Sequence, residues 1–162
     1  MRIKFTREEV IIIYEFLKKI NLKLANKECA VDIITDIMKI KDTAQKIKQE
    51  NIDVIEALQD DQFKQKNKEY QETKGEVEEY IKKNGSLPKD SDLYKKFESI
   101  WKEYKPLYDN FTDTVTKAIL QLDQEFEFSL KKLKLEDIVE ILDKSEVDYT
   151  VESISMIYKI IE

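Results

Sequence analysis

Two long series of apolar residues constrain the fold of this chain more than any other feature of its sequence. In each series the residues step alternately by three and four positions for about four heptads, which places a narrow apolar stripe along one side of a helix. The first series is Ala30, Ile33, Ile37, Ile40, Ala44, Ile47, Asn51, Val54 and Leu58, and the second is Tyr94, Phe97, Trp101, Tyr104, Tyr108, Phe111, Val115, Ala118 and Leu122. We therefore expect a long antiparallel helical hairpin that resembles a coiled coil.

The composition agrees with a mainly α fold. Charged residues make up 38% of the 162 residues and hydrophobic residues 41%, and the chain has only 2 Gly and 2 Pro. The charged share is well above the roughly 25% of a typical globular chain, and a sheet protein would need more turn residues. We predict more than about 60% helix, against a usual content near one third.

Short elements at the two ends of the chain are expected to form a small head. Alternating apolar residues predict a strand over 1–5, and a capping box of Thr6 and Glu9 predicts a helix over about 7–20. A second alternating run predicts a strand over 126–130, which is the best candidate to pair with the first.

The two long helices carry several sequence signals for bends or ends. The first should begin near Asn26 and extend toward the stop signal at 84–88, with a bend near Leu58 or Gly75. The second should begin at Asp90 or Ser91 and end near 122. Pro106 lies inside it, so we expect a kink or a restart there.

The C-terminal region should be helical in two places. A short helix is predicted over 135–142, and an extended segment over 147–149. Thr150 should cap a last helix with Val151, Ile154, Ile157 and Ile161 on one face. The resulting organisation is a single domain, 1–162, with a head of 1–45 plus 123–162 and a projecting helical hairpin of 46–122.

Several burial states follow from these patterns. Trp101 lies in the middle of the second series, so we expect it to be buried in the hairpin. Cys29 lies among apolar residues and is interpreted as a small buried hydrophobic residue. At the start of the long helix, three further apolar residues widen the stripe and predict burial against more than one neighbour. They are Val31, Ile34 and Met38.

The net charge of −6 is concentrated near the C-terminus. Residues 1–122 hold 23 acidic and 23 basic side chains, whereas residues 123–162 hold 11 acidic and 5 basic ones. Acidic surfaces repel phosphate backbones and attract basic surfaces, so we expect a protein partner with a basic surface and no direct nucleic-acid binding. The alternative is that the charge only aids solubility. The candidate partner-binding residues are Glu136, Asp137, Glu140, Asp143 and Glu146.

The residue inventory argues against catalysis. The chain has no histidine, which is the commonest general base and metal ligand, and its single cysteine excludes an internal disulfide. Two glycines ten residues apart cannot build a phosphate-binding loop. We expect no enzyme activity, cofactor or metal, although a carboxylate-metal enzyme assembled across helices is left as an unfavoured alternative. No apolar run approaches the ~18 residues of a membrane span, and no signal peptide opens the chain, so a cytoplasmic location is expected.

The opening Met1-Arg2-Ile3-Lys4-Phe5, the pair Phe16-Leu17 and the triplet Leu22-Lys23-Leu24 before a long charged helix resemble short, mostly helical proteins of tailed phages of Gram-positive bacteria, which are of uncharacterised function. The resemblance covers roughly the first 40 residues and identifies no site residues. It implies a phage or prophage origin.

Two functional interpretations follow. In the first, the protein binds and inhibits or redirects a host protein that acts in defence or handles nucleic acid, because an acidic surface could occupy a basic channel. In the second, it is a structural or assembly component of a virion, with the hairpin as a contact for homo-oligomers. The sparse apolar pattern of residues 59–84 motivates the second interpretation.

Overall fold

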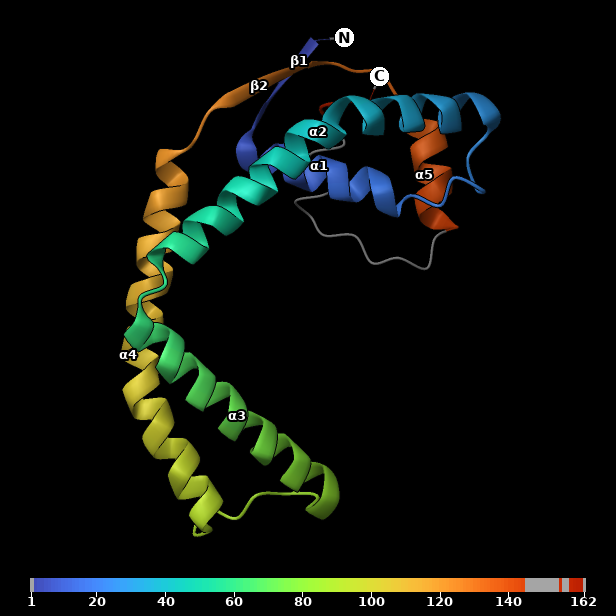
Figure 1. Ribbon diagram of the computed structural model, residues 1–162. Coiled ribbons are helices and arrows are strands. Elements are labelled where there is room, and N and C mark those ends of the chain that lie inside the picture. Colours follow the sequence, from blue (N-terminus) through green and yellow to red (C-terminus); the bar gives the residue numbers. More distant parts are fainter. Residues whose placement is uncertain (1, 145–154, 156–157, 162) are drawn as a thin grey trace. The chain divides into compact units, whose positions relative to one another are not determined.

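The computed structural model describes residues 2–144, 155 and 158–161 (Figure 1). Helices account for 74% of these described residues, and two strands among them form an antiparallel sheet, so the predicted mainly α fold is confirmed. In chain order the elements are β1 (Arg2–Thr6), α1 (Arg7–Lys19), α2 (Lys27–Leu58), α3 (Asp61–Asn84), α4 (Asp92–Gln121), β2 (Glu125–Ser129) and α5 (Leu135–Asp143).

The chain forms two compact units. Unit 1 consists of Met1–Asn51 and Leu122–Glu162, and unit 2 consists of Ile52–Gln121. The sequence places the first boundary at 45/46, whereas unit 1 continues to Asn51. An interaction inside unit 1 accounts for the difference: the buried Arg7 donates to Glu50 Oε2 at 2.6 Å and to Asn51 Oδ1 at 3.2 Å. The one polar residue of the first apolar series therefore has a partner on α1.

The sheet of unit 1 joins the two ends of the chain. β1 pairs antiparallel with β2, with Ile3 opposite Phe128 and Phe5 opposite Phe126. The predicted pairing is confirmed, with each strand shifted by one residue from its predicted bounds. The capping box is confirmed as well, because Thr6 Oγ1 accepts from the Glu9 N–H and a Glu9 carboxylate oxygen accepts from the Thr6 N–H at 3.0 Å.

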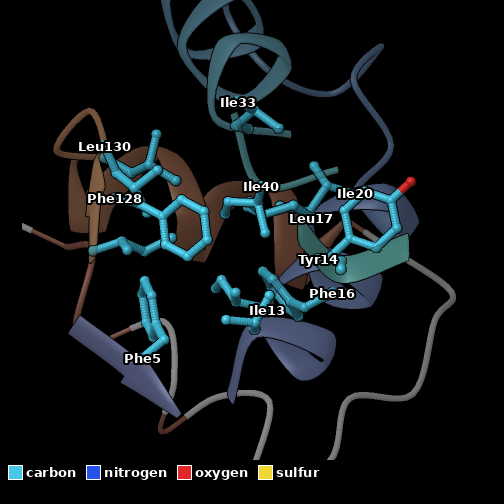
Figure 2. Packing of buried hydrophobic residues seen from close by; sticks show 14 of the residues in the cluster. Phe5, Ile13, Tyr14, Phe16, Leu17, Ile20, Ile33, Ile40, Phe128 and Leu130 are labelled. Atoms are coloured by element: carbon cyan, nitrogen blue, oxygen red, sulfur yellow. The ribbon is translucent and has the colours of Figure 1, made fainter. Parts of the chain in front are cut away.

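The core of unit 1 lies between the sheet, α1 and α2. Figure 2 shows Phe5 and Phe128 from the strands facing Ile13 and Leu17 of α1 and Ile40 of α2. The two phenylalanine rings lie 6.1 Å apart. Burial of a large apolar side chain stabilises by about 1.5–3 kcal/mol, so this cluster is the main source of stability in unit 1.

A fully buried carboxylate ties the segment after β2 to α2. Both carboxylate oxygens of Asp36 accept from the backbone N–H of Lys131, at 3.0 and 3.1 Å, and Lys39 Nζ lies 3.6 Å from Oδ1. Burial raises the pKa of Asp36, and the Lys131 N–H and Lys39 only partly oppose that effect. Asp36 is therefore harder to ionise in the folded protein than in the unfolded chain, although both of its oxygens accept from the Lys131 N–H.

The contribution of Asp36 to stability should change with pH. Because its folded pKa is raised above the ordinary value of about 3.9, the folded state holds this proton more firmly than the unfolded chain does. The free energy of unfolding of the wild type minus that of Asp36→Asn should therefore rise as the pH falls from 7 toward about 4. Urea titrations of both proteins across this range measure the difference, and a difference that does not vary with pH would contradict the raised pKa.

The wide apolar face predicted at the start of α2 is not buried. Val31, Ile34 and Met38 are 54%, 44% and 70% exposed. The residues of α2 that do enter the core include Ile33 and Ile40, which lie on the opposite side of the helix at 3.6 residues per turn. Burial against several neighbours was the wrong expectation, because the described neighbours of α2 pack against one side of it.

The long helix ends where one of the two predicted bends lies. α2 ends at Leu58 and α3 begins at Asp61. Asp60 caps the N-terminus of α3, because its side chain accepts from the Phe63 N–H at 2.7 Å. Gly75 lies inside α3 without interrupting it. The predicted restart at Pro106 does not occur, since α4 continues through this residue.

Unit 2 contains a helical hairpin held by aromatic side chains. Figure 1 shows α3 and α4 side by side, and the ring contacts fix an antiparallel alignment. Near one end Phe63 stacks on Phe111 at 4.2 Å, and farther along Tyr70 stacks on Tyr104 at 4.6 Å. Tyr104 Oη also donates to Asn67 Oδ1 at 2.8 Å, and burial raises the pKa of the Tyr104 phenol.

Trp101 is only half-buried, which corrects the expectation that it is enclosed by the hairpin. In a two-helix hairpin, a side chain on one helix is covered only by the facing helix. Most positions of the second apolar series therefore keep one side toward solvent. Tyr104, at 3% exposed, is the residue of that series that is buried. The contact of Trp101 with Tyr70, at 5.3 Å between ring centroids, accounts for its partial burial.

The stability of the hairpin should therefore depend more on Tyr104 than on Trp101. Tyr104→Ala should lower the free energy of unfolding by about 3–5 kcal/mol, and Trp101→Ala by about half as much. Tyr108→Ala is the matched control at a 45% exposed aromatic position and should cost about 1 kcal/mol or less. Urea titrations followed by circular dichroism measure the order, and a larger loss for Trp101→Ala than for Tyr104→Ala would contradict it.

Candidate protein-binding surface

The candidate residues lie on α5, which is fixed to unit 1 by one apolar side. Ile138 and Ile141 are each 1% exposed and belong to the core cluster, and Leu142 packs against it. Asn26, just before α2, donates to Asp137 Oδ1 at 2.7 Å and joins the starts of the two helices. These contacts leave the opposite side of α5 facing solvent.

Three of the five candidate acidic residues share that exposed side. Glu136, Glu140 and Asp143 are exposed and spaced by four and three residues, so they lie on one face of the helix. Asp137 is half-buried and accepts from Asn26, which directs it away from this face. Glu146 lies outside the described residues, as do the extended segment predicted over 147–149 and the cap predicted at Thr150.

The face carries a charge that the fold only partly compensates. Lys144 bonds the Glu140 carboxylate and lowers its pKa, so this carboxylate remains ionised at neutral pH. Within the described part of the chain, Glu136 and Asp143 form no ion pair. The acids of β2 differ, since Arg2 pairs with Glu127 at 3.7 Å and Lys4 with Glu125 at 3.1 Å.

This comparison locates the acidic excess more narrowly than the sequence does. Residues 1–51 hold 11 basic and 8 acidic side chains, and part of that basic excess neutralises β2. In the described C-terminal region, three exposed acids gather on the outer side of α5. We call Glu136, Glu140 and Asp143, with the neighbouring Leu135 and Val139, the α5 face.

Leu135 and Val139 were missed as surface residues by sequence reasoning. They are 44% and 53% exposed and lie one helical turn apart beside the acids. The available signal was the helical spacing: Ile138 and Ile141 define the buried side, and Leu135 and Val139 project away from it. Exposed apolar residues beside charges are typical of surfaces that bind proteins.

A polar depression lies between the starts of α2 and α5. It encloses about 180 Å³ and is lined by Glu28, Cys29, Asp32, Lys132, Leu133, Lys134 and Asp137. Cys29 is 4% exposed, which confirms its predicted burial. Burial is the main cause that raises the pKa of its thiol, and the nearby carboxylates of Asp137 and Asp32 raise it further. The thiol is therefore protonated at neutral pH and is a poor nucleophile or metal ligand.

Two findings concern the rest of the described chain. In residues 2–144, 155 and 158–161, no group of three acidic or cysteine side chains has an arrangement that could hold a metal ion. No helix in the same residues combines the length and the apolar character needed to cross a membrane.

Comparison with protein-family models, curated proteins and solved structures finds no match to this chain.

Proposed function

We propose that this protein acts by binding another protein, and that the α5 face contacts a basic surface on that partner. The observation that carries the proposal is the combination on α5 of three exposed acids with Leu135 and Val139, which are about half exposed. Apolar side chains supply contact area, and uncompensated charge selects the sign of the partner and accelerates the encounter.

The class of partner follows from the charge. Proteins that bind nucleic acid carry basic channels, and an acidic helix with apolar neighbours can occupy such a channel in competition with a phosphate backbone. We propose inhibition or redirection of a host defence or nucleic-acid-handling protein. A phage or prophage origin, which rests on the resemblance of the first 40 or so residues, fits that role.

A second candidate is a structural or assembly role in a virion. The hairpin favours it, because unit 2 exposes several large apolar side chains on a thin two-helix core. These are Ile52, Leu58, Ile81, Tyr108 and Leu120. Self-association through such a surface would complete the burial of the aromatic side chains that α3 and α4 cover only in part.

Reversing the charge of the α5 face should weaken partner binding through the association rate. Glu136→Lys, Glu140→Lys and Asp143→Lys all lie on the exposed side of one helix, so the fold should survive. The partner is first identified by capture from lysate of the source cells. The triple variant should then associate with the partner about tenfold more slowly than the wild type does. Raising the salt above physiological strength should slow association of the wild type by a similar factor.

A matched control makes the same change of charge on the hairpin. Glu72→Lys, Glu78→Lys and Glu98→Lys replace exposed acids whose ion pairs with neighbouring lysines contribute little to stability. Binding kinetics of both triple variants at two salt concentrations decide between the surfaces. Equal effects of the two triple variants would reject the α5 face, and a loss confined to the hairpin variant would favour the assembly role.

A further inference from the structure

The exposed side of α2 has the pattern of a second helix-pairing stripe. Val31, Ile34 and Met38 step by three and four residues on the side opposite the core, and all three are more than 40% exposed. Figure 1 shows α1 and α5 against the first half of α2, where they cover its other side. The stripe lies wholly within unit 1. Three large apolar side chains in line are more than the scattered single residues of an ordinary surface.

Among the charged side chains of α2 between residues 27 and 50, those at the two ends of the stripe form no ion pair within the described residues. Lys27 and Glu28 precede it, and Lys41 and Asp42 follow it; all four are exposed. Between residues 27 and 50, every other charged side chain of α2 has an ion-pair partner within the described residues: Asp32 with Lys131, Asp36 with Lys39, Lys46 and Arg7 with Glu50, and Lys48 with Glu15. In the described part of the chain, no ion pair forms at either end of the stripe.

We propose that this stripe is a dimer interface, and that its occupant is the same stripe of a second copy of the chain in the antiparallel orientation. The charge order identifies the partner. A two-fold axis between Ile34 and Thr35 brings Val31 to the level of Met38 in the second copy. The same operation brings Lys27 level with Asp42 and Glu28 level with Lys41. Both ends of the stripe therefore meet opposite charge, and each pairing occurs twice by symmetry.

Other arrangements of the same surface are less favourable. A parallel pair would place Lys27 beside Lys27 and Asp42 beside Asp42 of the second copy, which is repulsive at both ends. Pairing with the α5 face would bring Lys27 and Lys41 close to its three acids, but Asp42 and Glu28 would face the same acids and have no opposite charge. The antiparallel homodimer is the arrangement of these described surfaces in which every end charge has an opposite partner.

The length of the contact sets its strength. Lys27 to Asp42 spans about 22 Å of helix, which is shorter than a standard interface of about 1,600 Å² requires. The dimer is therefore weak, with dissociation in the micromolar to millimolar range. It does not depend on the proposed binding of a basic partner, because the α2 stripe and the α5 face share no residue.

Sedimentation velocity over a range of concentrations tests the interface. The wild type should self-associate, and Lys27→Glu or Asp42→Lys should each weaken association by about tenfold, because each substitution places like charges together twice. An equimolar mixture of these two variants should recover the wild-type affinity. In the mixed dimer the new glutamate at position 27 faces the new lysine at position 42 at one end, and the native Asp42 and Lys27 face each other at the other end. In a parallel dimer neither substitution alone would weaken association, because like charges already lie together at both ends of the wild-type pair. A contact elsewhere would respond neither to the single substitutions nor to the mixture.

Cross-linking gives a second measurement at the proposed axis. Ile34→Cys should form a disulfide-linked dimer under mild oxidation, whereas the equally accessible Val139→Cys on α5 should not. Circular dichroism of each variant verifies folding, which is expected because all the altered side chains are exposed. A wild type that stays monomeric at every concentration would overturn the proposal, as would self-association that none of the α2 substitutions changes.

Discussion

The pairing of β1 with β2 is the constraint on which the rest of unit 1 depends. It joins residues 2–6 to residues 125–129, so the unit can close only after most of the chain has been synthesised. Loop closure over such a separation has a substantial entropic cost, which the strands alone cannot offset. Phe5 and Phe128 offset it by entering a core shared with α1 and α2. Asp36 then fixes the chain after β2 through the Lys131 N–H.

A chain built mainly from amphipathic helices has more apolar positions than its thin units can enclose. Two surfaces of unit 1 follow from this limit. On α5 the exposed apolar residues lie beside three acids, of which Glu140 alone has an ion-pair partner among the described residues, and this arrangement is the reason for proposing a basic partner. On α2 they lie between two pairs of oppositely charged residues, which favours a second copy of the same stripe. The order of charges around an apolar surface, rather than its area, distinguishes these partners.

Much of the local structure was predictable because its causes are local. The capping box at Thr6 and Glu9 starts α1 wherever the helix lies, and alternation predicts both strands. The acidic character of 135–143 follows from composition, and helical spacing places Glu136, Glu140 and Asp143 on one face. The helical content followed in the same way from periodicity and from the scarcity of Gly and Pro.

By itself, the sequence determined which segments are helices and strands, where α1 is capped and where acidic charge collects. Only the tertiary structure decided which apolar side of each helix is covered. Val31 and Ile33 have similar local sequence signals, yet one is 54% exposed and the other 0%, because α1 and the strands pack on one side of α2. Trp101 is half-buried for the same reason, since α3 is its neighbour within the hairpin. Periodicity specifies the direction in which a side chain points, whereas burial requires a neighbour in that direction, and the neighbour comes from a distant part of the chain.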